Sequence, residues 1–323
     1  MHVTRRSFVI GASATLAASV LQAEPRAILQ IRGPAFGAEW QVSLPDDADV
    51  RTIISAVSGI VSSVDLSASP FRADSEISGF NRLQTRDWIP LSPQTLDIIR
   101  EAKRVAALTG GAFDPTLGGS VGRYGFGPIT TPKAGSFSEL SLSRRGVRKA
   151  HPAQTLDLCG IAKGYALDRI ANAIATLGHQ DFFVELGGEV TARGRHPDGR
   201  PWRAGIERPI DGATEVQLVV SIEHEALATS GDALNSYAFG NRRYSHIIDP
   251  SSQLPVVTSL ASVSVFARRA IIADALATAL YAMGAEKGVA FAEHMEIAAL
   301  FIMRDAGRLR SRTTHDFATR MIG

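Results

Sequence analysis

The chain has a single cysteine, Cys159, among its 323 residues. This scarcity excludes an internal disulfide and any metal site built from several thiolates. The Gly-x-x-x-x-Gly-Lys-Ser/Thr loop, the Gly-x-Ser-x-Gly elbow and the His-Glu-x-x-His pair are also missing from the sequence. A formal net charge of +2, with only short arginine clusters, argues against nucleic acid as a partner. What is present is a globular composition, 45% hydrophobic and 20% charged, in a chain long enough to bury a large core.

The first residues have the layout of a twin-arginine signal peptide. Thr4-Arg5-Arg6-Ser7-Phe8-Val9-Ile10 is followed by a weakly apolar stretch to Leu21 and then by Gln22-Ala23. The apolar stretch is shorter than the roughly 20 residues that a membrane span needs, which favours a cleaved signal peptide. The alternative is that the segment remains as an uncleaved membrane anchor. We therefore expect a signal peptide at residues 1–23 and a mature protein, residues 24–323, that is exported to the periplasm.

Apolar periodicity predicts an α+β fold in one large unit. Spacings of three and four indicate helices from Val50 to Val64 and from Gln94 to Leu108, the second ended by Gly110-Gly111. A polar, Gly- and Pro-rich stretch at 118–138 is typical of a long excursion. Further helices are expected up to Leu177, over Ala273–Met283 and around Val289–His294, and strands at 40–44, 182–186, 202–207, 216–222 and 297–303.

The segment from Leu156 to Asp168 is the most informative part of the chain. It ends a strand-like run and opens a helix with Lys163 in its first turn. Free backbone NH groups and the positive end of the helix dipole point out of such a start, and the lysine adds a full charge, so the segment is a candidate phosphate site. The alternative is an ordinary strand-to-helix turn with a surface lysine.

A second candidate site lies on the predicted helix at 273–283. Asp274 and Thr278 are four residues apart and therefore share one helix face, where a carboxylate and a hydroxyl could ligate one hard cation. The alternative makes Asp274 a helix N-terminal charge and Thr278 a hydroxyl bonded to its own helix. Taken singly, His246 fits a structural histidine, and Asp114 and Asp249 fit turn residues.

Together and in this order, these segments resemble the ApbE family, the FAD:protein FMN transferases. The resemblance implies an α+β, ApbE-like (T-fold-related) single catalytic unit with mixed sheets and flanking helices. It also implies an enzyme that splits the pyrophosphate of FAD, transfers FMN to a Ser or Thr hydroxyl of an acceptor protein and releases AMP. The resemblance covers nearly the whole mature chain and rests on the segments 36–40, 74–81, 111–116, 156–168, 185–189, 228–232, 244–250 and 273–280.

The resemblance assigns roles residue by residue. The Mg²⁺ ligands would be the Gly160 carbonyl oxygen, Asp274 and Thr278, and Asp274 would thereby be catalytic. We add the hypothesis that His246 is the general base, because of its place in Tyr-Ser-His-Ile-Ile-Asp-Pro. Mg²⁺ and Lys163 would neutralise the charge that develops on the pyrophosphate. The FAD-contacting positions would be Phe36, Phe71, Ala112, Phe113, Asp114, Asp157, Lys163 and Ile248.

Three residues depart from the family pattern. Cys159 stands where members usually have a small residue, Ala38 replaces a frequent threonine, and Ala277 stands where some members carry a second aspartate. The last departure implies a cation held with one carboxylate fewer. None of the three removes a predicted ligand.

Two other functions fit the same residues. An Mg²⁺-dependent FAD pyrophosphatase would arise if the site admitted water in place of an acceptor, and a periplasmic flavin-binding module would bind without turnover. The metal-ligand pattern argues against the second, because binding alone does not require a cation beside the phosphates. Exported relatives are associated with electron-transfer complexes, so we expect an exported or membrane electron-transfer protein as the acceptor.

Overall fold

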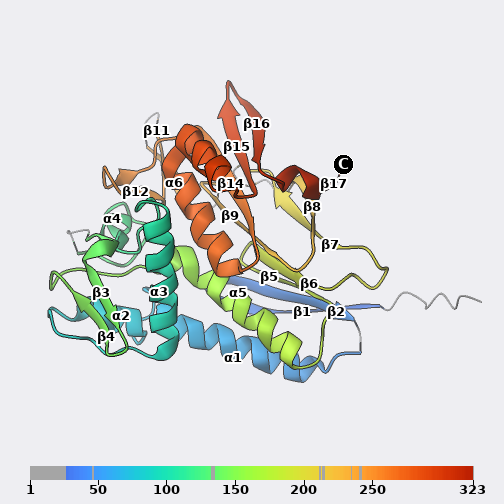
Figure 1. Cartoon of the computed structure of the whole chain (residues 1–323), viewed down its shortest axis with the longest axis horizontal. Coiled ribbons are helices and arrows are strands. Elements are labelled where there is room, and N and C mark those ends of the chain that lie inside the picture. Colours follow the sequence, from blue (N-terminus) through green and yellow to red (C-terminus); the bar gives the residue numbers. More distant parts are fainter. Residues whose placement is uncertain are drawn as a thin grey trace, which may run out of the picture.

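The computed structural model describes residues 27–45, 47–131, 135–210, 212, 215–233, 235–239 and 242–322. The predicted signal peptide, residues 1–23, lies outside these ranges. The described residues form an α+β fold in layers, with helices on one face of a large antiparallel sheet and a small sheet on its other face (Figure 1). The predicted fold class is confirmed.

The large sheet has eight strands, and each strand is antiparallel to its neighbours. Side chains alternate between its faces, so Phe182 and Val184 join the core under the helices while Phe183 joins the core on the other side. The strands, in spatial order, are β1 (Ile28–Ala35), β2 (Ala38–Pro45), β5 (Phe182–Leu186), β6 (Glu189–Arg193), β9 (Ala226–Gly231), β14 (Leu260–Ala267), β15 (Ala299–Asp305) and β16 (Arg308–Thr314).

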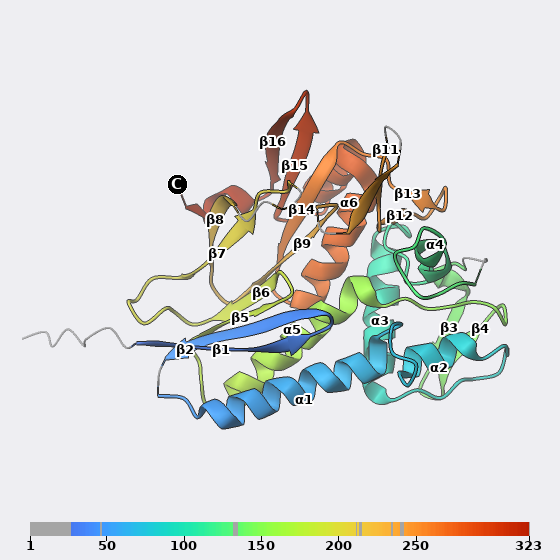
Figure 2. The ribbon, with the colours of Figure 1, turned by 180° about the vertical axis from the view of Figure 1, so that it is seen from behind.

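Three long helices pack on one face of this sheet. Figures 1 and 2 show α5 lying between α1 and α6, and both neighbours contact it. By length and composition alone α1 could cross a membrane, but its apolar stripe, including Ile53, Val57 and Val64, is buried in the core. The helices are α1 (Val50–Ala68), α2 (Glu76–Arg82), α3 (Pro93–Leu108), α4 (Gly118–Arg123), α5 (Cys159–Thr176) and α6 (Ala270–His294), with 3₁₀ turns η1 (Phe137–Glu139) and η2 (Phe317–Arg320).

Smaller sheets complete the described part of the chain. A three-stranded sheet covers the second face of the large sheet, with Trp202, Ile206 and Ile222 in the core between them. It consists of β7 (Trp202–Glu207), β8 (Val216–Ile222) and β17 (Met321–Ile322), and three hairpins are formed by β3 (Leu140–Ser143) with β4 (Gly146–Lys149), β10 (Ser236–Phe239) with β11 (Arg242–Ser245), and β12 (Ile248–Asp249) with β13 (Leu254–Pro255).

Most predicted elements are found in the structure. The strands at 182–186, 202–207 and 216–222 have the predicted bounds, and α3 begins one residue before its prediction. The stretch 118–138, expected as a long excursion, contains α4 and part of η1. The helices expected over 273–283 and around 289–294 are confirmed, because α6 is broken between them at Gly284, where φ is 78° and ψ is 177°.

The helices α5 and α6 approach each other closely at Gly164. A Cβ atom at this position would lie 2.4 Å from the Ala270 carbonyl oxygen and 2.7 Å from Ile271 Cα. Both contacts are to backbone, which cannot rotate aside as a side chain could. The approach therefore requires glycine, and it brings the start of α5 against the start of α6.

Gly164→Ala is expected to push α5 away from α6 and lower the free energy of unfolding by about 1–3 kcal/mol, the usual cost of overpacking. The matched control is Gly59→Ala in α1, where an added Cβ has no heavy atom within 4 Å. There the alanine is expected to raise stability by about 0.5–1 kcal/mol, because it fits a helix better than glycine. Urea unfolding of both variants checks the prediction, and equal effects of the same sign would contradict it.

Candidate functional site

The start of α5 is shaped by Asp157 rather than by a preceding strand. Residues 154–158 have no strand assignment, so the strand-like run predicted there is wrong, whereas the helix start at Cys159 is confirmed. Asp157 Oδ1 accepts a hydrogen bond of 2.9 Å from the Cys159 amide, and the Asp157 amide donates to the Pro115 carbonyl at 2.7 Å. Gly160 departs from helical geometry (φ −82°, ψ 16°), so the first turn is irregular. These bonds join α5 to the segment 112–116.

Lys163 has a side chain that is 32% exposed and pairs with a buried carboxylate. Its Nζ is 2.6 Å from Glu189 Oε1 and donates a longer bond of 3.4 Å to the Gly187 carbonyl. Asp274 Oδ2 accepts a 2.9 Å hydrogen bond from the Gly164 amide, one residue along α5. Glu189 and Asp274 are only 3% and 4% exposed. We call Lys163, Glu189 and Asp274 the charge cluster.

The charge cluster carries one more negative than positive charge when all three groups are ionised. Burial raises the pKa of Glu189 to about 8 and also raises the pKa of Asp274, and the Asp274 charge adds to the effect on Glu189. Burial opposes the charge on Lys163, but the two carboxylates outweigh it and raise the lysine pKa. The site therefore retains a proton that an added cation could replace.

The residues beside the charge cluster fit a hard cation. A Cβ built on Gly160 would lie 3.3 Å from Thr278 Oγ1, so the Gly160 backbone and the Thr278 hydroxyl are neighbours. Glu189 Oε2 is buried without a hydrogen-bond partner. Within the described ranges no three His, Cys, Asp or Glu side chains group as a metal site, so a cation here would depend on backbone and hydroxyl oxygens as well.

Asp274 and Thr278 contact other elements rather than their own helix. Asp274 accepts from α5, and Thr278 Oγ1 lies 3.1 Å from Ser230 Oγ at the end of β9. The alternative interpretation of an N-terminal helix charge and a self-bonded threonine is therefore wrong. The structure brings the three residues predicted to hold Mg²⁺, Gly160 among them, to one place.

The predicted FAD strip lies against the same place. Phe113 is 4% exposed, and its ring is 3.3 Å from the Cβ position of Gly160. Ala112 follows Gly111, whose φ of 87° turns the chain after α3. Burial raises the pKa of Asp114, whose carboxylate accepts hydrogen bonds from Thr116 and the Phe137 amide. Asp114 therefore orders its own loop.

The three remaining FAD positions differ in their surroundings. Phe36 is half-buried in the β1–β2 turn with a φ of 50°, and this turn is near the cluster because Gly187 contacts both Ala38 and Lys163. Ile248 is 3% exposed at the start of β12. Phe71 follows α1 and is 66% exposed, so its contact with a flavin stays a prediction.

His246 is held by the backbone of Asn235. The His246 amide and Nδ1 each lie 3.1 Å from the Asn235 carbonyl oxygen. A carbonyl only accepts, so Nδ1 carries the proton and Nε2 keeps a free lone pair. Burial lowers the pKa of His246, which favours this neutral form near pH 7. The ring packs edge-on against Phe126, with 6.3 Å between centroids. The geometry suits a general base.

Sequence reasoning missed the roles of Glu189 and Ser230. Both belong to segments that were singled out, 185–189 and 228–232, but glycine turns explained those segments equally well. Only the pairing of β6 and β9 in the sheet brings them beside α5 and α6.

Known proteins resemble this chain over most of its length. The ApbE family model matches residues 36–301. An FAD:protein FMN transferase from Vibrio cholerae is 34% identical over 297 residues, covering 87% of this chain and 89% of that protein. The solved flavin transferase ApbE from Vibrio cholerae superposes with a TM-score of 0.84 at 32% identity, and the match covers 92% of this chain and 100% of that one. The apo flavinyl transferase ApbE from Pseudomonas stutzeri superposes with a TM-score of 0.82 at 32% identity, and the match covers 91% of this chain and 97% of that one.

Lys163→Met is expected to cost about 3–5 kcal/mol of stability, because it leaves buried carboxylates without their cation. Burial raises the pKa of Glu189 in the folded protein to about 8, whereas the pKa of a free glutamate is 4.5. The folded state thus holds more protons than the unfolded one, and the stability of the variant should fall as the pH rises through this window. Urea unfolding at several pH values checks this. The double variant Lys163→Met/Glu189→Gln should recover stability and lose the pH dependence; a steep pH dependence in it would contradict the assignment.

Proposed function

Because the chain belongs to the ApbE family, we propose that it is an FAD:protein FMN transferase that depends on Mg²⁺ and acts on a Ser or Thr hydroxyl of an acceptor protein. The observation that carries this proposal is the meeting of a buried anionic cluster, a helix start and a neutral histidine at one place. Residues from α5, α6 and β6 supply the first two, and His246, whose pKa is influenced by the charges of Lys163 and Asp157, supplies the third. Such a site can bind a cation and a pyrophosphate and accept a proton.

The cation would be held by the Gly160 carbonyl, the Thr278 hydroxyl and the Asp274 carboxylate, with Glu189 and Lys163 balancing the charge. The closeness of Gly160 to Thr278 and the bond from the Gly164 amide to Asp274 support this ligand set. When bound, Mg²⁺ would act as a Lewis acid that neutralises charge on the pyrophosphate oxygens. Lys163 and the NH groups at the start of α5 would bind the remaining phosphate charge.

The protein's own residues would carry the proton transfer. His246 Nε2 takes the proton of the acceptor hydroxyl as the oxygen attacks the phosphorus on the FMN side of FAD. The P–O bond to the AMP phosphate breaks, and AMP leaves with the bonding electrons. Nδ1 stays bonded to the Asn235 carbonyl, which holds the ring in position. The products are the FMN phosphoester and AMP.

The proposed place of action is supported by the first residues of the sequence, and the proposed acceptor by the resemblance to exported relatives. The twin-arginine pattern at residues 4–10 supports export of the folded protein to the periplasm. An exported or membrane electron-transfer protein is the acceptor that this location favours.

Mass spectrometry of a Ser/Thr acceptor domain incubated with the mature protein, FAD and Mg²⁺ should show the gain of one FMN. Asp274→Asn keeps an oxygen for the Gly164 amide but loses the charge, and we expect transfer to fall roughly 10²-fold, a few kcal/mol of barrier. The control Asp97→Asn, in an exposed ion pair on α3, should transfer normally. If AMP and free FMN accumulate and the acceptor gains no FMN, the protein is a pyrophosphatase instead. If neither product forms, it is a binding module.

The transfer rate should depend on pH through His246. Because burial lowers its pKa below the usual 6.5, the single-turnover rate is expected to stay constant from about pH 8 to 6.5 and to fall only below that. His246→Gln should reduce the rate by about 10²–10⁴-fold and remove the acidic limb. An unchanged rate in His246→Gln would show that another group is the base.

A further inference from the structure

Asp232 joins the large sheet to the hairpin that precedes His246. It follows Gly231, the last residue of β9, and its amide donates to the Ala261 carbonyl of β14 at 3.2 Å. The residue is only 5% exposed although it carries a charge. A buried carboxylate needs partners, and those of Asp232 come from two different elements.

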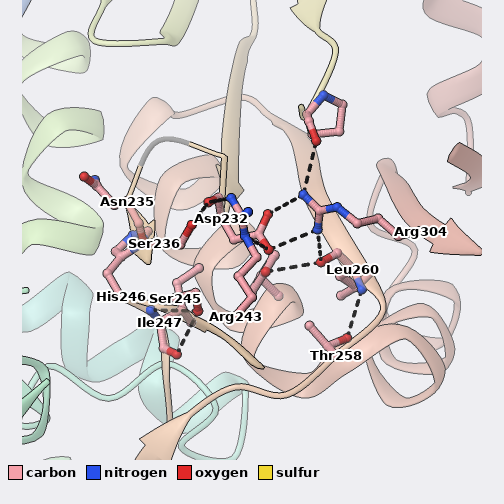
Figure 3. Close-up of polar contacts among 12 residues, drawn as sticks. Asp232, Asn235, Ser236, Arg243, Ser245, His246, Ile247, Thr258, Leu260 and Arg304 are labelled. Carbon is pink, nitrogen blue, oxygen red and sulfur yellow. Dashed lines mark hydrogen bonds and ion pairs between the residues drawn. The ribbon is translucent and has the colours of Figure 1, made fainter. Parts of the chain in front are cut away.

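The first partner is Arg304, near the end of β15. Its Nη1 and Nη2 donate to Asp232 Oδ2 and Oδ1 at 3.0 and 2.7 Å, a two-point contact between planar groups (Figure 3). Nη2 also donates to the Pro209 carbonyl at 3.1 Å, and the Arg304 amide is bonded to the Ser259 carbonyl. The guanidinium is therefore fixed by the sheet and fixes Asp232 in turn.

The second partner belongs to the hairpin. Arg243 Nε lies 3.0 Å from Asp232 Oδ2, and its Nη2 donates to the Asp232 carbonyl at 2.7 Å. The Ser236 hydroxyl donates to the same carbonyl at 2.6 Å. One residue from each strand of the β10–β11 hairpin is thus tied to Asp232.

The segment fixed in this way contacts both parts of the site. Ser230, two residues before Asp232, is bonded to Thr278, a predicted Mg²⁺ ligand. Asn235, three residues after Asp232, accepts both hydrogen bonds from His246. Asp232 lies between these two residues in the sequence, and Figure 3 shows Arg304 and Arg243 both directed toward it.

We propose that Arg304 is a positioning residue for FMN transfer, which acts by holding Asp232 so that the Asn235 carbonyl orients the His246 ring. Arg304 contacts neither the charge cluster nor the predicted FAD strip by any hydrogen bond among the described residues, so its effect passes through Asp232 and through Ser236 and Arg243 of the hairpin, which are bonded to the Asp232 carbonyl. A shift of about 1 Å in a catalytic group can cost 10²-fold in rate. This inference rests on the proposed function.

Arg304→Gln is expected to lower the single-turnover transfer rate at saturating FAD by about 10–10²-fold, with the dissociation constant of FAD changed less than twofold. Arg304→Lys keeps one charged contact with Asp232, so its transfer rate should fall less than that of Arg304→Gln. The control is Arg310→Gln on β16, whose 73% exposed side chain pairs with Asp305 and should leave the rate unchanged. Normal rates in both Arg304 variants would overturn the proposal.

A double-mutant cycle separates positioning from a general loss of structure. In the His246→Gln background, Arg304→Gln should reduce the residual rate less than twofold, because the group it positions is gone. The same fold loss in both backgrounds would mean that Arg304 acts through overall folding, and the proposal would fail. If Arg304→Gln does not fold, the cycle is run with Arg304→Lys.

Hydrogen–deuterium exchange supplies a readout that does not need turnover. Amides in the peptide spanning 230–246 should exchange faster in Arg304→Gln than in the wild type, while those of α3 should not change. If exchange is faster in Arg304→Gln but the wild-type protein transfers no FMN, the anchoring is supported and the proposed function alone is rejected. If exchange in Arg304→Gln is the same as in the wild type and the wild type transfers FMN, the anchoring alone is rejected.

Discussion

The hydrogen bond from the Gly164 amide to Asp274 Oδ2 is the contact on which the site depends. It forms only because α5 and α6 approach so closely that no side chain fits at Gly164. The same approach puts Gly160 beside Thr278. The packing of α5 against β6 puts Lys163 within reach of Glu189, so the residues proposed to hold the cation come together where α5 contacts both elements.

The second constraint is electrostatic. Two carboxylates and one ammonium group in the interior leave an excess negative charge, which is costly unless a proton or a cation compensates it. Without a metal the compensation is a proton on Glu189. A divalent cation would displace that proton and satisfy the buried Glu189 Oε2, which has no hydrogen-bond partner. The excess negative charge of the cluster is therefore the feature that supports the proposed cation.

Much of the fold could be predicted, because helices such as α3 and strands such as β7 have clear apolar periods. The pairing of Asp274 with Thr278 followed from helical geometry alone. The part that could not be predicted is long-range: the register that places Glu189 and Ser230 beside the helices, and the contact of Arg304 with Asp232, 72 residues away. The strand expected before α5 was wrong because hydrogen bonds of Asp157, rather than a sheet ladder, hold that segment.

The most direct test of this account is calorimetric titration of Mg²⁺ into the protein near pH 7, in two buffers with different ionisation enthalpies. With the Glu189 pKa at about 8 and Lys163 and Asp274 as the charged groups facing it, the account predicts binding of one ion with release of nearly one proton. The Asp274→Asn variant should bind Mg²⁺ more weakly and release fewer protons on binding. Binding that releases no proton, or that is equal in Asp274→Asn, would contradict the charge cluster as the cation site.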